Sequence, residues 1–471
     1  METKYTQLAN TIRNEIRMGV YTEGQKIPSL RMIQALKSCS LTTAKEAYRI
    51  LFEEGLVEIR EKSGYYVRKN LSLSKFYLKN EIYDDYKADD RIQKIVKDMM
   101  NPDLIQLGSA ILNESYLPIK QILMSFKNTL RREYIFNYGD LLGVAELRKK
   151  ISHLLIKNDL NISEKNIQIT NGCTAALSYA LLDLCEKGDA VIVPSPTYMG
   201  AYQILETLNL KVIELPYRTK GEIDLFELIS ICKKFRPKAM LVSSNFNNPT
   251  GTSLTENQKI EISEILIQFK VSLIEDDIYG DLYFENRRPR PMLYYYDLKK
   301  KEVGQAKKNE CKSYYASSFS KQLSPGLRIG YLASQTSISS VEKISRAINL
   351  SLNLVNQWTV YDYLVRHSFE KYLHKLRLKL QTNVKKFESF LELSNKVSTG
   401  YQSPKGGFVL WIPTRRDSNK VFEEARKYGI AIAPGRLFGI SDQWKYFVRI
   451  NAGLPWGNKL EKKLEILRDL L

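Results

Sequence analysis

A lysine in a short polar stretch is the residue best suited to covalent chemistry in this chain. Lys321 stands three residues after Ser318 and seven before Arg328, in a Ser/Gly/Pro-rich loop that leads into the apolar, strand-like stretch 329–332. A lysine amine can form a Schiff base with a carbonyl cofactor, while a hydroxyl and a guanidinium can hold a phosphate of the same molecule. A solvated lysine in a polar loop has the same local sequence, so the interpretation depends on the remaining chain.

The elements that would position Lys321 are β-like runs that alternate with helical ones from about residue 104 onward. This alternation predicts an α/β domain with a largely parallel sheet, and such sheets bind ligands at the carboxyl ends of their strands. The predicted strands are 167–169, 190–193, 211–215, 239–242, 271–274 and 329–332.

Four loops after these strands carry side chains that suit a flat, phosphorylated heterocycle. The first, at Gly172, Cys173 and Thr174, opens a helix whose free amides can bind a phosphate. A tyrosine ring can stack on a heterocycle, an amide or a phenol can hydrogen-bond to it, and a carboxylate can pair with a ring N–H. The other three loops supply Tyr198, Asn248, Asp276 and Tyr279. Taken alone, each residue is more typical of a helix cap, a core aromatic, a turn or a solvated acid.

Together with the Lys321 loop, these four loops resemble the fold type I, pyridoxal-phosphate-dependent class I and II aminotransferases over about residues 104–471. The resemblance implies that Lys321 forms the internal aldimine with pyridoxal 5′-phosphate and that Asp276 pairs with the pyridinium nitrogen. The other cofactor contacts that it implies are the ring contacts Tyr198, Asn248 and Tyr279, and the phosphate contacts Gly172, Cys173, Thr174, Ser318 and Arg328.

Three more residues take their expected roles from the same resemblance. Tyr138, within the stretch 137–143, matches the tyrosine that reaches the neighbouring subunit's phosphate, which implies a homodimer. Arg449 matches the arginine that takes the substrate α-carboxylate, a task suited to a bidentate guanidinium. Arg449 is therefore the expected substrate or effector anchor, and Arg436 is a candidate second contact to a carboxylate.

The first seventy residues predict a small module of a different kind. Apolar spacing predicts a helix over 5–18, a second short helix after Pro28-Ser29, and a third helix with Ser40 as its N-cap. The stretch 56–67 then has the pattern of a hairpin. Three helices and a hairpin form a winged helix-turn-helix, whose second motif helix can enter the DNA major groove.

The stretches 24–31, 47–57 and 64–67 resemble the GntR-type DNA-binding domain. Lys37, Leu41 and the single glycine of the wing depart from the usual pattern of that family, which affects the expected sequence preference more than binding itself. A helical protein-interaction module is the alternative interpretation. The resemblance implies contacts to phosphates, base edges or the groove through Arg31, Ser40, Thr42, Thr43, Lys45, Lys62 and Gly64.

Composition narrows the class of partner. The chain has 471 residues, a net charge of +19 and a pI near 9.4, which favours nucleic acid over a membrane. Residues 1–69 hold an excess of only four positive charges, so charge alone does not locate the DNA site. Without a long apolar run or a signal-peptide pattern, the chain is expected in the cytoplasm. Five scattered cysteines and three histidines predict neither disulfides nor a metal site.

The expected organisation is a GntR-type winged helix over 1–69, a linker over 70–103 and an aminotransferase-like α/β domain over 104–471. The small domain of this last part is expected at roughly 345–471 together with its N-terminal stretch. This combination resembles the MocR subfamily of bacterial regulators, which implies a DNA-binding regulator that senses an amino compound, or pyridoxal phosphate itself, through Lys321. An active aminotransferase of amino acids is the alternative, and the sequence leaves open the effector, the operator and whether transamination turns over.

Overall fold

The computed structural model describes residues 4–17, 21, 24–37, 39–53, 56–60, 63–68, 82–83, 93, 97–98, 101–218, 221–304, 311–394 and 400–471. The chain divides into two units between residues 80 and 81. Lys62 and most of the predicted linker lie outside the described residues. Within that predicted linker, Ile82–Tyr83 form a short strand, β3, of the second unit's large sheet.

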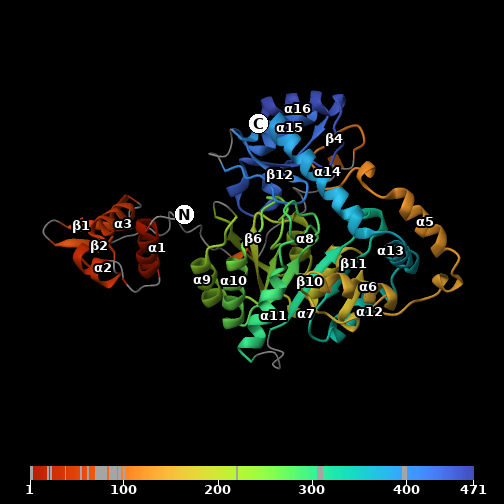
Figure 1. Ribbon diagram of the computed structural model, residues 1–471, viewed down its shortest axis with the longest axis horizontal. Coiled ribbons are helices and arrows are strands. Elements are labelled where there is room, and N and C mark those ends of the chain that lie inside the picture. The colour runs from red at the N-terminus through yellow and green to blue at the C-terminus, as the bar shows by residue number, and fades with distance from the viewer. Residues whose placement is uncertain are drawn as a thin grey trace. The chain divides into compact units, whose positions relative to one another are not determined.

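The first unit is the predicted set of three helices and a hairpin. Its elements are α1 (Lys4–Arg17), α2 (Leu30–Leu36), α3 (Leu41–Glu53), β1 (Val57–Arg60) and β2 (Gly64–Val67) (Figure 1). The Ser40 hydroxyl accepts a hydrogen bond from the Thr43 amide at 3.0 Å, so Ser40 caps α3 as predicted. The buried Tyr48 donates its hydroxyl to the Pro28 carbonyl at 2.6 Å, which joins α3 to the turn before α2.

The second unit is built on an eight-stranded sheet with the order β3-β7-β6-β8-β9-β10-β11-β5. Neighbouring strands from β7 to β10 are parallel, while β3, β11 and β5 join by antiparallel pairing. The strands are β5 (Ile167–Thr170), β6 (Ala190–Ser195), β7 (Lys211–Pro216), β8 (Ala239–Val242), β9 (Ser272–Asp276), β10 (Ser313–Ser318) and β11 (Gly330–Ala333).

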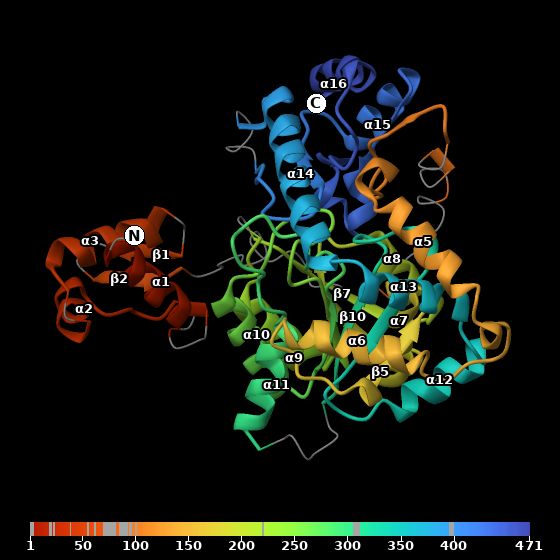
Figure 2. The ribbon, with the colours of Figure 1, turned by 45° about the vertical axis from the view of Figure 1, so that its right-hand side comes forward.

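Helices cover both faces of this sheet, so its strands are buried on both sides (Figures 1 and 2). One face packs against α6 (Ala145–Ile156), α9 (Leu225–Phe235), α10 (Glu256–Gln268), α11 (Met292–Glu302) and α13 (Leu354–Arg366). The other face packs against α7 (Cys173–Leu184), α8 (Met199–Thr207) and α12 (Ser339–Asn349). The result is the predicted α/β architecture with helices on both faces of a mostly parallel sheet.

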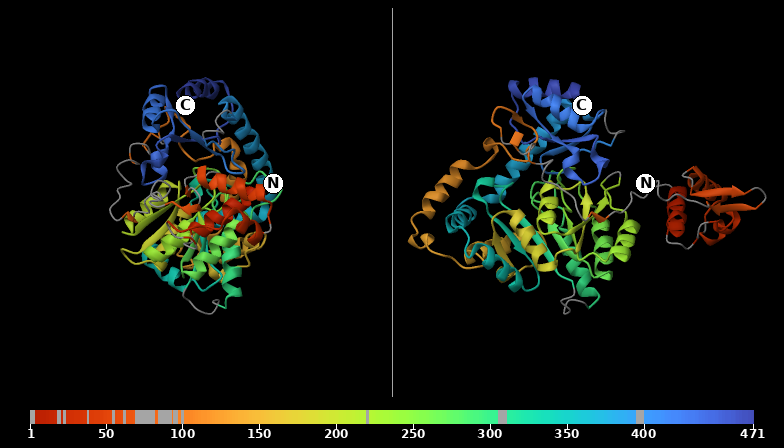
Figure 3. Two further views of the ribbon diagram at one scale, coloured as in Figure 1. Left: turned by 90° about the vertical axis from the view of Figure 1, so that its left-hand side faces the viewer. Right: turned by 180° about the vertical axis from the view of Figure 1, so that it is seen from behind.

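A smaller subdomain stands beyond one end of the sheet and has its own apolar core (blue in Figure 3). Its elements are β12 (Val409–Pro413), α15 (Ser418–Lys427), β13 (Ile430–Ala431), β14 (Ala433–Pro434), β15 (Phe447–Asn451) and α16 (Asn458–Leu470). The N-terminal strand β4 (Ile105–Gln106) pairs with β13 and so returns the start of this unit to the small subdomain. The long α14 (Phe369–Phe390) contributes its first half to the large core and its second half to the small one.

The remaining described helices lie between these elements or at their ends. Helix α5 (Ile119–Thr129) runs along α13. The short 3-10 helices are η2 (Glu114–Tyr116), η3 (Glu133–Phe136), η4 (Glu164–Asn166), η6 (Pro325–Leu327), η8 (Gly435–Phe438) and η9 (Asp442–Trp444). None of the described helices is both long enough and apolar enough to cross a membrane.

Candidate functional site

The loops at the carboxyl ends of the strands surround one cavity of about 270 Å³, called here the Lys321 cavity. Parallel strands bring their carboxyl ends to the same edge, so loops far apart in the sequence meet there. The lining residues that the sequence also predicts are Cys173, Thr174, Tyr198, Asn248, Asp276, Tyr279, Lys321, Arg328 and Arg449.

Lys321 lies on the loop after β10, and its ammonium group is enclosed by the protein. Its Nζ donates to the Ala110 carbonyl at 2.5 Å and lies 5.7 Å from the centre of the Tyr279 ring. Burial lowers the pKa of Lys321 to about 8, with a further decrease from the charge of Arg449, while Asp276 opposes the shift. A substantial fraction of this amine is therefore neutral, and nucleophilic, near physiological pH.

The pKa of Lys321 predicts how its reactivity changes with pH. Below about pH 8 the rate at which Lys321 takes up pyridoxal phosphate should rise about tenfold per pH unit, because only the neutral amine attacks a carbonyl. Above that pH the rate should level off. Stopped-flow absorbance across pH 6 to 10 checks this, and a rate that still rises steeply between pH 9 and 10, as an amine with the ordinary lysine pKa of 10.5 would give, would contradict it.

Asp276 is the last residue of β9 and carries a buried carboxylate. Its Oδ1 accepts hydrogen bonds from the Ile278 amide at 3.2 Å and from the Cys173 thiol at 3.4 Å. Burial raises the pKa of Asp276 to about 6, and these two hydrogen bonds limit the rise. Asp276 is therefore mostly an anion at neutral pH and can accept a hydrogen bond from a protonated ring nitrogen.

A helix N-terminus and a guanidinium face one another at one end of the cavity. Gly172 precedes α7 with φ 82°, and a Cβ at this position would lie 2.6 Å from Nη2 of Arg328. Arg328 donates to the Asn171 carbonyl at 3.0 Å. The first amides of α7 have no intrahelical partner and the helix dipole favours negative charge, so this end suits a phosphate.

Arg449 on β15 is 2% exposed, and its hydrogen bonds within the described part of the chain go to uncharged acceptors. Its Nη1 donates to Oδ1 of Asn248 at 2.9 Å, its Nη2 donates to the Gly108 carbonyl, and its Nε has no partner among the described residues. Burial lowers the pKa of Arg449 to about 10, which still leaves the side chain charged at neutral pH. A buried charge without a counterion is costly, so the arrangement favours an anionic ligand.

The structure leaves four predicted site residues away from this lining. Gly172 adjoins it through backbone only, and Tyr138 is 80% exposed on the surface. Ser318 ends strand β10, where sequence reasoning placed a loop, and lines a neighbouring cavity instead. Arg436 forms ion pairs with Asp417 and Asp442 and does not line the Lys321 cavity, so the structure does not support it as a second carboxylate contact.

Several lining residues were missed from the sequence. Ser320 precedes Lys321 and lines the cavity, a role that its position beside the lysine could have suggested. No sequence signal identified the loop before η2, because its place depends on the pairing of β4 with β13. The missed residues are Ser109, Ala110, Ile111, Leu177, Met199, Ser243, Ile278, Ser320 and Pro325.

The predicted DNA contacts lie around the start of α3 and on α2. Arg31, Thr42 and Lys45 are exposed, whereas Thr43 is half-buried. The Ser40 hydroxyl caps α3 and lies 2.8 Å from the Thr43 hydroxyl. Gly64 begins β2 with φ 110°, a backbone conformation that favours glycine at the wing. Lys62 lies outside the described residues.

The Lys321 cavity fits pyridoxal phosphate on three observations. Lys321 lines the cavity, so its amine can reach the carbonyl carbon of a ligand bound there, and a phosphate fits the helix end beside Arg328. The Tyr279 hydroxyl is buried without a hydrogen-bond partner among the described residues, so a ligand oxygen would satisfy it. Among the same described residues, no group of three or more His, Cys, Asp or Glu side chains could hold a metal.

The fold and this cavity define a class of protein: a winged helix joined to a fold type I aminotransferase-like unit. Residues 102–458 match the aminotransferase class I and II family, and residues 4–67 match the gntR family of bacterial regulatory proteins. Among solved structures, the α-aminoadipate aminotransferase LysN of Thermus thermophilus, complexed with N-(5′-phosphopyridoxyl)-L-leucine, has a TM-score of 0.71 at 21% identity. That match covers 85% of this chain and 98% of LysN.

The sequence matches to two transcriptional regulators extend over both units. An uncharacterized HTH-type transcriptional regulator, YdcR of Escherichia coli K12, is 30% identical over 99% of this chain and 99% of its own length. The HTH-type transcriptional regulator NorG of Staphylococcus aureus USA300 is 27% identical over 89% of this chain and 93% of its own. The chain belongs to the MocR subfamily of GntR-type transcriptional regulators, in which the DNA-binding domain is fused to a class I and II aminotransferase domain.

Proposed function

We propose that this transcriptional regulator holds pyridoxal phosphate in the Lys321 cavity and senses an amino compound there. The observation that carries the proposal is that one cavity holds a partly neutral lysine amine and a buried arginine with no counterion among the described residues. The first suits a carbonyl cofactor and the second suits a carboxylate. Sensing then requires that the occupied and empty states of the cavity differ in their affinity for DNA.

The chain's own residues divide the work of binding. Pyridoxal phosphate, when bound, supplies a carbonyl that condenses with amines and a ring that accepts electrons. Lys321 supplies the neutral amine, and the Asp276 anion holds a proton at the ring nitrogen. Tyr279 donates its unpartnered hydroxyl, and the α7 N-terminus with Arg328 orients the phosphate.

Arg449 predicts that the effector carries a carboxylate. Substituting Arg449→Gln should weaken the binding of an amino acid by about 10- to 100-fold, since a hydrogen bond to a charged group contributes about 1.5–3 kcal/mol. The corresponding decarboxylated amine should bind equally well to both proteins. Spectral titration with a panel of amino acids, each paired with its decarboxylated amine, measures this.

Arg449→Lys serves as the matched variant, because it keeps the positive charge and removes the planar fork. It should recover part of the lost affinity for amino acids. Equal losses for amino acids and their amines would contradict the assignment, since they would indicate a damaged cavity rather than a missing carboxylate contact.

An active aminotransferase is the second candidate function, favoured by the presence of Lys321 beside Asp276 in one cavity. The two candidates differ in turnover. A sensor should transaminate an amino acid slowly or not at all. An enzyme should transaminate many equivalents of the amino acid when an oxo acid is supplied as acceptor. Product formation per subunit over time distinguishes them.

We also propose that two copies pair through an apolar surface around α5 and η3. Exposed side chains there include Leu123, Met124, Phe136 and Tyr138, and Ile111, which lines the Lys321 cavity, is also exposed. Apolar patches of this kind mark interfaces. A second copy is the expected occupant, because Tyr138 would then reach the neighbouring phosphate site.

A charged substitution tests this pairing. Leu123→Asp/Met124→Asp should shift the protein from dimer to monomer and weaken cofactor binding, because burying two carboxylates without partners is costly. Sedimentation equilibrium measures the mass, with Lys187→Asp at an exposed position away from α5 as the control for the same change of charge. A wild-type protein that sediments as a monomer of 54.5 kDa would contradict the proposal.

A further inference from the structure

A second cavity, called here the arginine cavity, lies on the other side of the segment that carries Lys321. It has a volume of about 380 Å³, within the range of small-molecule sites, which is about 300–1,000 Å³. Ser317, Ser318 and Gln322 line it, whereas Ser320 and Lys321 line the Lys321 cavity. One short segment therefore separates the two cavities.

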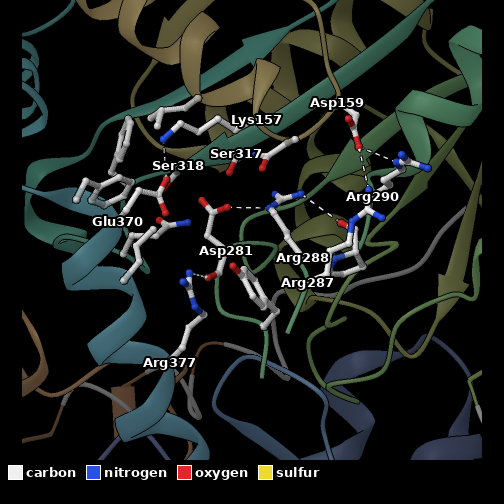
Figure 4. Close-up of a pocket in the computed structure, with 18 of the residues that line it drawn as sticks. Lys157, Asp159, Asp281, Arg287, Arg288, Arg290, Ser317, Ser318, Glu370 and Arg377 are labelled. Atoms are coloured by element: carbon white, nitrogen blue, oxygen red, sulfur yellow. Dashed lines mark hydrogen bonds and ion pairs between the residues drawn. The ribbon is translucent and has the colours of Figure 1, made fainter. Parts of the chain in front are cut away.

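Three separate parts of the chain supply charged side chains to the arginine cavity (Figure 4). They are the end of α6, the loop between β9 and α11, and the first half of α14. Arg288 is already neutralised there, because its Nη2 lies 2.7 Å from Oδ2 of Asp277 and its Nε lies 2.8 Å from Oδ1 of Asp281. A ligand would have to use other groups.

Two of the other cations share one carboxylate. Arg290 lies 2.6 Å and Arg287 lies 3.8 Å from the same Oδ2 of Asp159. Arg290 also approaches Glu256, outside the cavity lining, at 3.7 Å. Arg287 is 74% exposed and its one ion pair with a described residue is long, so its guanidinium is available to another anion at little cost.

Two more cations come from the opposite wall. Lys157 lies 3.2 Å from Glu370, and both side chains are more than half exposed. Arg377 forms no ion pair with any described residue; it donates to the Asp281 carbonyl at 3.2 Å and lies over the Tyr283 ring at 4.2 Å. Arg287 and Arg377 are therefore the two lining cations that no close carboxylate neutralises among the described residues.

One buried residue of the cavity wall, Gln322, has a side-chain oxygen without a hydrogen-bond donor among the described residues. Gln322 is 2% exposed, and its Nε2 donates to the Ile278 carbonyl at 3.4 Å. Its Oε1 has no hydrogen-bond partner among the described residues. A buried acceptor of this kind is normally satisfied, and because Gln322 lines the cavity, a turn of its side chain would bring this oxygen to a ligand with a hydroxyl or an amine.

We propose that the arginine cavity is a second ligand site, which binds a phosphate monoester that also carries a hydrogen-bond donor. A phosphate monoester has a charge of about −1.5 to −2 at pH 7, which the two guanidinium groups of Arg287 and Arg377 can balance. Guanidinium forks bind phosphate oxygens in pairs, and Lys157 adds a third positive charge to the lining. The site is separate from the cofactor's phosphate site at Arg328 and does not depend on it.

The test is calorimetric titration of the full-length protein saturated with pyridoxal phosphate, so that the Lys321 cavity is occupied. The probes are inorganic phosphate, glycerol 3-phosphate and glycerol. Both phosphate probes should bind saturably at one site per subunit, glycerol 3-phosphate the more tightly, and glycerol alone should not bind. The variant Arg287→Gln/Lys157→Gln should weaken both phosphate probes by about tenfold or more.

These two substitutions affect side chains that are 74% and 60% exposed, so the variant should fold. The control Lys187→Gln/Lys233→Gln removes the same charge from exposed positions elsewhere and should bind like the wild type. The proposal is overturned if neither phosphate probe binds, or if the cavity variant and the control bind equally. Absorbance reports cofactor binding separately, so failure of the cofactor proposal would be visible on its own.

Discussion

Replacing Lys321 with alanine should abolish the visible absorbance band that pyridoxal phosphate acquires when it joins a protein lysine. Lys321 is the lysine that lines the cavity beside Asp276, and burial has already lowered its pKa to about 8. Without its amine, the helix N-terminus, Arg328 and Tyr279 can hold the phosphate and ring only noncovalently. Absorbance spectra of the dialysed proteins, after loading with pyridoxal phosphate, measure the change.

The matched control for this experiment is another buried lysine. Burial also lowers the pKa of Lys259 to about 8, but Lys259 donates to Asn245 at 2.5 Å and to the Arg290 carbonyl at 2.7 Å, outside the Lys321 cavity. Lys259→Met should therefore keep the band, and Lys187→Ala provides a second control at an exposed position outside the core. A Lys321→Ala protein with an unchanged band would show that the cofactor is held elsewhere.

Removing Arg31 and Lys45 should produce the second large effect, on DNA affinity. Both side chains are exposed, on α2 and at the start of α3, the part that enters the major groove in helix-turn-helix proteins. If both contact phosphates, Arg31→Ala/Lys45→Ala should lower the slope of log K against log salt by about 2. Affinity at moderate salt should fall by about 10- to 100-fold. Fluorescence anisotropy with a duplex from the protein's own upstream region gives both quantities.

The control for the DNA experiment is a second double variant with the same net charge as Arg31→Ala/Lys45→Ala. Lys187→Ala/Lys233→Ala removes two exposed cations from the second unit and should leave the salt slope close to that of the wild type. Measuring the same variants with a random duplex then distinguishes contacts to bases from contacts to phosphates. A loss confined to the specific duplex indicates base contacts, and a loss shared by both indicates phosphate contacts. No loss on either duplex would remove Arg31 and Lys45 from the interface.

Much of the Lys321 cavity could be predicted from sequence because parallel strands are easy to recognise. Apolar runs such as 190–193 and 239–242 are strands in the structure, and the polar residues after them meet at one edge of the sheet. Strand β10 was missed, because Ser313–Ser318 has hydroxyls and two tyrosines in place of aliphatic residues. It is a strand because β9 and β11 pair with it on both sides.

The missed strand also explains the position of Ser318. A loop residue can turn its side chain in many directions, whereas the last residue of a paired strand has its direction set by the ladder. Ser318 pairs with Gly330 and lines the arginine cavity, so its predicted contact with the cofactor phosphate stays a prediction. Ser320, two residues later and outside the strand, lines the Lys321 cavity.

The sequence could not predict the arginine cavity, because no single stretch contains its pattern. Lys157, Arg287 and Arg377 are far apart along the chain and belong to a helix end, a loop and a long helix. Each is an ordinary surface cation in its own segment. Only the packing of α14 against the loop after β9 brings them around one space.

The most direct test of the central claim is the effect of an amino compound on DNA affinity at fixed salt. The cofactor-loaded protein is titrated with its own upstream duplex, with and without the amino compound that most changes its absorbance spectrum. In the wild type the affinity should change by about fivefold or more, a typical size for coupling between two sites. In Lys321→Ala it should not change. Equal DNA affinity with and without that compound in the wild type would contradict the account, and so would an equal change in Lys321→Ala.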